Sequence, residues 1–226
     1  MGLGYNPKRL QRHFVNIRDI IYRMEYIDSD NNPAKAPDLE LGSIEFENLK
    51  TPSDLLAFMD GIEYGFVGND GEKYSEQDER FRDSWYPKCI VQSGDELLES
   101  RCGTCWDQVE LERKWFKEHA YQFVTIFSWF EVKKPNNYPN HTFLAFNDNE
   151  KWYWFEHAYS GNRGIHEFAA LDDLVNEVKT RLLEDAIDSG VANPEDDSSI
   201  NTCPYDEPPR NLDVDGYIRH VSCKND

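Results

Sequence analysis

Three segments rich in aromatic and β-branched residues follow one another between positions 120 and 159. They read "AYQFVTIFSWFEV", "HTFLAF" and "KWYWFEHAY", and polar, turn-rich stretches separate them. This composition predicts three β-strands. The connections hold no pattern of a crossover helix, so we expect the strands to pair antiparallel.

Helical patterns occur mainly before these strands. Apolar residues recur at three- and four-residue steps at about 7–27, 105–119 and 170–187, and Thr51 and Pro52 mark the start of another helix. "GDELLES" predicts a short helix just before the first pair of cysteines. Helices followed by a meander of strands, without βαβ alternation, indicate an α+β fold with an antiparallel sheet.

The remaining segments complete one expected domain that spans residues 1–226. Its core is expected at about 50–187, after a helical N-terminal lead-in at 1–49. The polar stretch "VGNDGEKYSEQDERFRDSWYP" predicts a surface excursion, and the acidic segment 188–226 is expected to be mobile, with "GYIRHVSC" as a final strand.

Composition narrows the classes of partner. The net charge of −19 repels nucleic acid and anionic lipid, so we expect neither a nucleic-acid nor a membrane partner. The start of the chain shows no signal-peptide pattern, and no apolar run is long enough to span a bilayer, which predicts a cytoplasmic location. In that compartment the default state of the five cysteines is the free thiol.

Two cysteines three positions apart, Cys102 and Cys105, precede a predicted helix in "ESRCGTCWDQVELERKWF". A redox pair is one interpretation, although thioredoxin-like proteins place a strand directly before such a motif. A zinc site with Cys203 and Cys223 is another, although those two are not closely spaced. Two unremarkable thiols are the third interpretation.

A nucleophile accounts for more of the pattern. Gly103 allows a sharp turn, after which Cys105 begins the helix. The backbone N–H groups and the dipole at a helix N-terminus favour a thiolate, and the same amides can hold an oxyanion. A thiolate nucleophile also needs a base and a group that orients the base.

His141 and Glu156 provide that base and that orienting group. In a hairpin centred on "NDNE", pairing Phe146 with Lys151 puts His141 directly opposite Glu156 on one face. A turn with an odd number of residues would separate the two side chains, because side chains alternate between faces.

These residues resemble the transglutaminase-like superfamily. "GTCWDQVELER" resembles its cysteine motif, "HTFLAF" its histidine strand and "WYWFE" its acid strand, although this chain has Glu where Asp is usual. The resemblance covers about residues 50–170, and the chain is similar in particular to bacterial transglutaminase-like proteins. It implies a papain-like core in which a helix bearing the cysteine packs on an antiparallel sheet.

The resemblance also implies roles. Cys105 would attack an amide or carbonyl carbon, His141 would move the proton, and Glu156 would orient the imidazole. Gln92 is a candidate for the oxyanion hole and Trp106 for a wall of the site. The substrate would be a protein or peptide, no cofactor or metal is implied, and hydrolysis, deamidation and cross-linking all stay open. A non-catalytic binding module on this scaffold and a structural zinc protein are the alternatives.

Neighbouring polar residues receive structural roles. Asp107, Glu110 and Glu112 are expected on a solvated helix face, with Asp107 also able to cap the helix. His157 is expected on the opposite strand face, as a second-choice base. Three further residues are expected in a turn or a loop: Asp148, Arg163 and His166.

Overall fold

The computed structural model describes residues 45–130, 140–188 and 200–223. The chain divides into two units, Met1–Glu45 and Phe46–Asp226, and nearly all described residues belong to the second. The helix predicted at about 7–27 lies outside the described residues.

A five-stranded antiparallel sheet with the order β6-β5-β4-β3-β7 is the centre of the second unit. Its strands are β3 (Gln122–Phe130), β4 (Asn140–Asp148), β5 (Lys151–Glu156), β6 (Gly164–Phe168) and β7 (Ile200–Tyr205). The predicted α+β class and the three predicted strands are confirmed. Strand β6 is not among the predicted elements: His166 is expected in a loop, but it pairs with Trp154 in this strand.

Six α-helices lie in the described part of the second unit. They are α2 (Pro52–Met59), α3 (Phe81–Lys88), α4 (Gly94–Ser100), α5 (Cys105–Glu118), α6 (Leu171–Asp188) and α7 (Val214–Val221). Helices α2, α4, α5 and α6 occupy the positions that the sequence predicts. The side chain of Thr51 accepts from the backbone N–H of Asp54 and begins α2 as expected.

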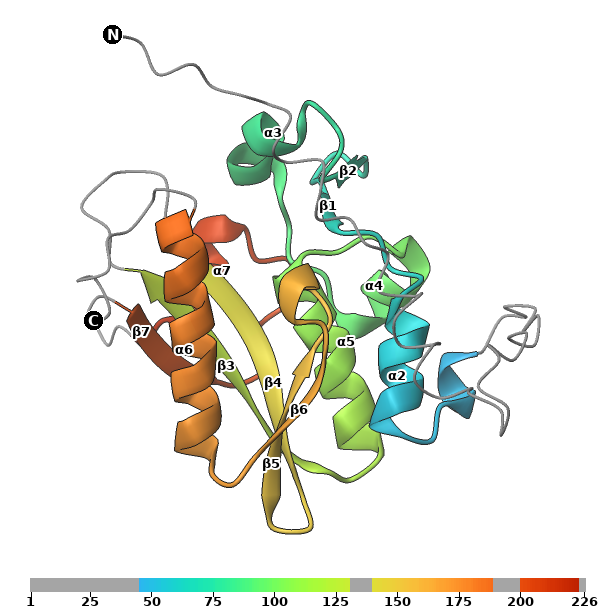
Figure 1. Ribbon diagram of the computed structural model, residues 1–226. Helices are drawn as coiled ribbons and strands as arrows, with labels where there is room; N and C mark the ends of the chain where they lie inside the picture. The colour runs from blue at the N-terminus through green and yellow to red at the C-terminus, as the bar shows by residue number, and fades with distance from the viewer. Residues whose placement is uncertain (1–44, 131–139, 189–199, 224–226) are drawn as a thin grey trace, which may run out of the picture. The chain divides into compact units, whose positions relative to one another are not determined.

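Helices cover both faces of the sheet (Figure 1). Helix α5 packs on one face, and α6 packs on the other. The first interface buries Leu111, Trp115, Phe116, Leu144, Phe146 and Phe155. The second buries Ile126, Phe143, Ala145, Trp154, Leu174 and Val178. Side chains of β4 and β5 therefore alternate between two apolar layers, which fixes the register of this hairpin.

The register of the β4–β5 hairpin differs from the prediction by two residues. Asp148 pairs with Lys151, so the turn consists of Asn149 and Glu150 alone, both with positive φ (51° and 65°). Two positive φ angles are typical of the tight type I′ turn, whose twist matches that of the strands. The prediction that His141 lies directly opposite Glu156 is therefore wrong, but a shift of two residues keeps both on one face.

The polar stretch before α4 is more ordered than a surface excursion. It contains the end of β1 (Gly65–Val67), strand β2 (Lys73–Ser75), which pairs with β1, and most of α3. Phe66 and Tyr74 are fully buried and stack with their ring centroids 4.8 Å apart. The sequence pattern missed this hairpin because its strands are only three residues long.

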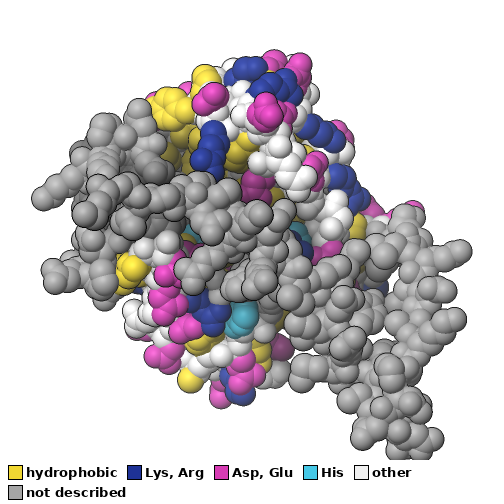
Figure 2. Space-filling model, turned by 45° about the horizontal axis from the view of Figure 1, so that its top comes forward, with side chains coloured by type: hydrophobic (Ala, Val, Ile, Leu, Met, Phe, Trp, Pro, Cys, Tyr) yellow, Lys and Arg dark blue, Asp and Glu magenta, His cyan; other side chains and the backbone are white. Residues whose placement is uncertain are grey.

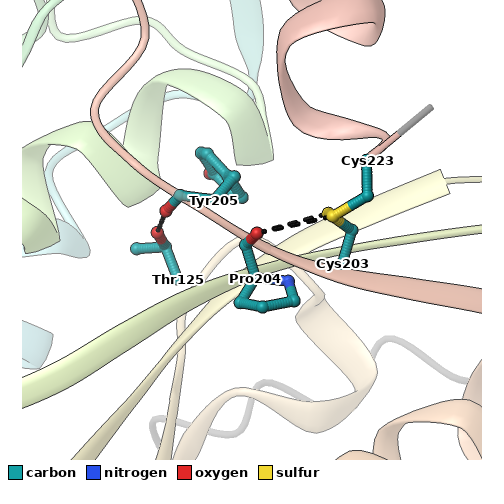
Figure 3. Close-up of a disulfide and its surroundings, with 5 residues drawn as sticks. All are labelled: Thr125, Cys203, Pro204, Tyr205 and Cys223. Atoms are coloured by element: carbon teal, nitrogen blue, oxygen red, sulfur yellow. Dashed lines mark hydrogen bonds between the residues drawn. A yellow bond between two sulfur atoms is a disulfide. The ribbon is translucent and has the colours of Figure 1, made fainter. Parts of the chain in front are cut away.

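The C-terminal segment also departs from the prediction. Residues 200–205 form β7, within a segment expected to be mobile, and "GYIRHVSC" forms most of helix α7 instead of a strand. A disulfide joins Cys203 of β7 to Cys223 just after α7 (Figure 3), so the expectation of free thiols is wrong for these two residues. Nearby, the Thr125 hydroxyl donates to the carbonyl of Tyr205 at 2.7 Å, which fixes β7 beside β3.

Acidic and basic side chains are interspersed on the face shown in Figure 2. The negative net charge is thus not gathered into one patch on the described residues of this face. Among the described helices, none combines the length and apolar character that crossing a membrane requires.

Candidate active site

Cys105 is the first residue of α5, as the sequence predicts. The carboxylate of Asp107 closes this helix end by accepting from the backbone N–H and hydroxyl of Thr104, at 2.8 and 3.0 Å. Its second oxygen accepts from the backbone N–H of Gln92 at 2.7 Å. The first-turn N–H groups of Cys105 and Trp106 occupy positions that have no carbonyl partner within a helix.

Glu156 holds the imidazole of His141. Nε2 of His141 donates to Oε2 of Glu156 at 2.7 Å, and both side chains are buried. Because Leu144 pairs with Phe155, Glu156 lies diagonally across from His141. A diagonal pair is farther apart than a directly opposed pair, and the long side chain of Glu can span that distance.

Two further donors fix the carboxylate of Glu156. The indole Nε1 of Trp154 donates to Oε2 at 3.0 Å, and the backbone N–H of Tyr159 donates to Oε1 at 2.7 Å. The carboxylate therefore accepts from Trp154 of its own strand, from Tyr159 in the loop after that strand, and from His141. A carboxylate with three donors is a rigid, charged acceptor for an imidazole.

The other side of His141 meets Cys105. Burial opposes the charged form of His141, but the charge of Glu156 and hydrogen bonds with Cys105 and Glu156 raise its pKa to about 10. Since Nε2 is bound to Glu156, Nδ1 is the atom left for the thiol. At neutral pH this arrangement favours an imidazolium beside the sulfur.

Cys105 and His141 share a cavity of about 250 Å³. Its other lining residues are Tyr64, Asn140, Ala158, Tyr159, Leu182, Asp185 and Ala186. The sulfur and the imidazole can therefore both meet a ligand that enters this cavity.

Trp106 connects the cysteine helix to the histidine strand. Its indole Nε1 donates to Oδ1 of Asn140 at 2.9 Å, and its ring stacks on Tyr217 of α7 at 4.3 Å. Trp106 is 2% exposed and lies in a core cluster. It therefore packs in the core next to the site and does not form a wall of the cavity.

Gln92 supports the cysteine loop. Its side-chain Nε2 donates to the carbonyl of Cys102 at 2.8 Å, and the residue is buried. It lines a cavity of about 360 Å³ on the α4 side of α5, and not the cavity at Cys105. The structure thus shows Gln92 in a positioning contact, and its expected part in an oxyanion hole stays a prediction.

The other cysteines do not line the cavity at Cys105. Cys89 and Cys102 are free and buried, and burial raises the pKa of both, that of Cys102 to about 11. Cys203 and Cys223 are bonded to each other, so the four-cysteine set of the zinc alternative is not assembled. In the part of the chain that the structure describes, no group of three or more His, Cys, Asp or Glu side chains is placed to hold a metal ion.

The prediction of a solvated face on α5 is wrong. Asp107, Glu110 and Glu112 are all buried, at 5% exposure or less. Burial raises the pKa of Asp107 to about 6, and it raises the pKa of Glu110 to about 7 against the opposing charge of Arg113. Nε of Arg113 donates to Glu110 at 2.8 Å, whereas Oε2 of Glu112 has no hydrogen-bond partner among the described residues.

His157 points to the other face of its segment, as the alternation predicts. Its Nδ1 donates to Oε1 of Gln108 at 2.7 Å, and Nε2 of Gln108 donates to the carbonyl of Gly103 at 2.9 Å. Burial lowers the pKa of His157 and so favours its neutral form. Gln108 is not among the predicted site residues, because its position on an apparently polar helix face gives no sign of its burial.

Tyr64 is the other residue of the site that the sequence analysis missed. It lines the cavity together with Cys105, and the two side chains interact electrostatically. Because Tyr64 lies far from Cys105 in the sequence, the pairing that brings them together leaves no local sequence signal.

Comparison of the chain with models of known protein families finds no match, and comparison with curated proteins finds none either.

Proposed function

We propose that this chain is a thiol-dependent acyl-transfer enzyme that acts on amide bonds of a protein or peptide, on a papain-like core of the transglutaminase-like type. The observation that carries the proposal is the hydrogen bond from His141 to Glu156, which leaves the second imidazole nitrogen for Cys105 at the start of α5. A base held by an acid beside a helix-start thiol is the arrangement that nucleophilic catalysis requires.

The proposed reaction proceeds in two steps. The sulfur of Cys105 bonds to the acyl carbon while its proton resides on His141, and the carbon–nitrogen bond breaks as His141 gives that proton to the leaving amine. In the second step an acceptor attacks the thioester, loses its proton to His141 and releases the sulfur. Water as acceptor gives hydrolysis or deamidation, and an amine gives cross-linking.

Selective alkylation tests the proposal. At pH 6, iodoacetamide should modify Cys105 at least about 10-fold faster than Cys89 or Cys102, because ordinary thiols are almost fully protonated there. The site of modification is measured by peptide mapping. Cys102→Ser should retain the fast reaction, and Cys105→Ser should lose it.

The matched controls are two histidine variants. His141→Ala should slow the reaction of Cys105 at pH 6, whereas His157→Ala should not, because His157 faces Gln108. If Cys105 reacts no faster than a thiol that lacks a base, or if His141→Ala leaves its rate unchanged, the chain is not this kind of enzyme.

A further inference from the structure

Backbone pairing places Tyr64 beside the cysteine loop. The N–H of Glu63 donates to the carbonyl of Arg101 at 2.9 Å, and the N–H of Gly103 donates back to Glu63 at 3.0 Å. The N–H of Gly65 then donates to the carbonyl of Gly103 at 3.4 Å. Tyr64 therefore lies between two residues that are both tied to the loop leading into Cys105.

This approach is close enough to require glycine at position 65. A Cβ atom there would lie 2.5 Å from the carbonyl oxygen of Tyr74 and 2.7 Å from the sulfur of Cys102. The carbonyl of Tyr64 also accepts from the N–H of Glu76 at 2.9 Å. The backbone at Tyr64 is thus fixed from two sides, and the direction of its side chain is constrained with it.

Tyr64 lines the same cavity as Cys105 and His141. Its phenol interacts electrostatically with the side chain of Cys105, and this interaction contributes to the shift of its pKa. Burial, and then the negative charge of Cys105, raise the pKa of Tyr64 well above its usual value, so its hydroxyl keeps its proton at neutral pH. A protonated phenol beside a thiolate is a hydrogen-bond donor.

Other donors near the sulfur are already in use. Nε2 of Gln92 donates to the carbonyl of Cys102, and the N–H of Thr104 donates to Asp107. Among the described residues, Tyr64 offers a hydroxyl group at the cavity, and the first-turn N–H groups of α5 lie at the helix end that Cys105 begins.

We propose that Tyr64 is a catalytic residue that donates a hydrogen bond first to the Cys105 thiolate and then to the oxyanion formed when that thiolate attacks the acyl carbon. This role rests on the proposed thiol chemistry. As the sulfur–carbon bond forms, the carbonyl electron pair moves to oxygen, and the negative charge moves with it to an atom close to the sulfur. Tyr64 keeps its proton throughout, and the pair returns as the leaving group departs.

Two reagents separate this role from a general effect on the thiol. Iodoacetamide alkylates sulfur without forming an oxyanion, whereas p-nitrophenyl acetate acylates it through a tetrahedral oxyanion and releases p-nitrophenolate. Both rates are measured against pH up to their plateau, where the thiolate is fully formed. In Tyr64→Phe, acylation at the plateau should fall by about 10²-fold while alkylation at the plateau stays near the wild-type rate.

Tyr153→Phe is the matched control, because it removes a hydroxyl from a tyrosine that does not line this cavity. The hydroxyl of Tyr153 donates to Glu167 of strand β6 at 3.2 Å. This variant should keep both plateau rates. An unchanged acylation rate in Tyr64→Phe, or an equal loss of both reactions, would give Tyr64 a structural role and overturn the inference. A wild-type protein whose Cys105 reacts with neither reagent would instead overturn the proposed function.

Discussion

Replacing Glu156 by Gln is expected to slow the acylation of Cys105 by about 10²- to 10⁴-fold. The carboxylate accepts from three donors, which are Nε2 of His141, Nε1 of Trp154 and the N–H of Tyr159. A carboxamide offers one oxygen, so its NH2 group must face at least one of these donors. His141 loses its charge partner in either orientation of the amide, and it also loses the acceptor of Nε2 wherever the NH2 group faces it.

The release of p-nitrophenolate from p-nitrophenyl acetate measures this effect in the pre-steady state. Glu167→Gln is the control, because Glu167 is an exposed acid on the adjacent strand β6 that binds Lys151. It should keep the wild-type rate. If Glu156→Gln also kept the wild-type rate, Glu156 would not orient a working base, and the binding-module hypothesis would become the better one.

Replacing Glu112 by Gln is expected to stabilise the protein at pH 8. Glu112 is 2% exposed and its Oε2 has no hydrogen-bond partner in the described residues. Burial, followed by the charge of Glu156, raises the pKa of Glu112 well above its ordinary value. Gln has nearly the same shape and carries no charge, so it avoids the cost of burying a carboxylate.

The size of this effect depends on pH. Because the folded state holds the Glu112 proton more tightly than the unfolded state, its favourable contribution is complete below the unfolded pKa near 4.5. That contribution is lost as the pH rises from there through the raised folded value. The melting temperature of Glu112→Gln should therefore exceed that of the wild type at pH 8, and the difference should disappear near pH 4.

Each pKa unit corresponds to about 1.4 kcal/mol, and each 1 kcal/mol moves the melting temperature of a chain of this size by about 2 to 4 °C. Thermal melts in buffers from pH 4 to 8 can resolve such shifts. Glu118→Gln, an exposed substitution on the same helix, should show no comparable dependence on pH. A Glu112→Gln variant that is less stable than the wild type at pH 8 would contradict the account of Glu112 as a buried acid.

The residues that make the candidate site were largely accessible from the sequence. Cys105, His141 and Glu156 each stand at a helix or strand position that local patterns predict. Their side chains meet because the hairpin turn has an even number of residues, although the exact register was two residues off. The partners of these residues were not accessible, because Tyr64 and Gln108 reach the site through long-range packing.

The parts of the fold that were missed have different physical causes. Strands β1 and β2 are too short to show alternation, and β7 pairs with β3, a strand distant in sequence. Helix α7 was mistaken for a strand because eight residues containing Tyr217, Ile218 and Val221 suit either structure. Three acidic residues of α5 are buried, although acidic residues usually lie at the surface. Caps, an ion pair and protonation compensate the cost of burying them.

The position of β7 in the sheet has a consequence for biosynthesis. Residues 125–130 of β3 pair with residues 200–205 of β7 along one edge and with β4 along the other. During translation β3 leaves the ribosome well before β7. One edge of β3, which is rich in aromatic residues, therefore has no partner strand until the C-terminal segment is synthesised. Such edges promote pairing with other chains. A transcript that ends before codon 200 would make this exposure permanent, and its product is expected to aggregate.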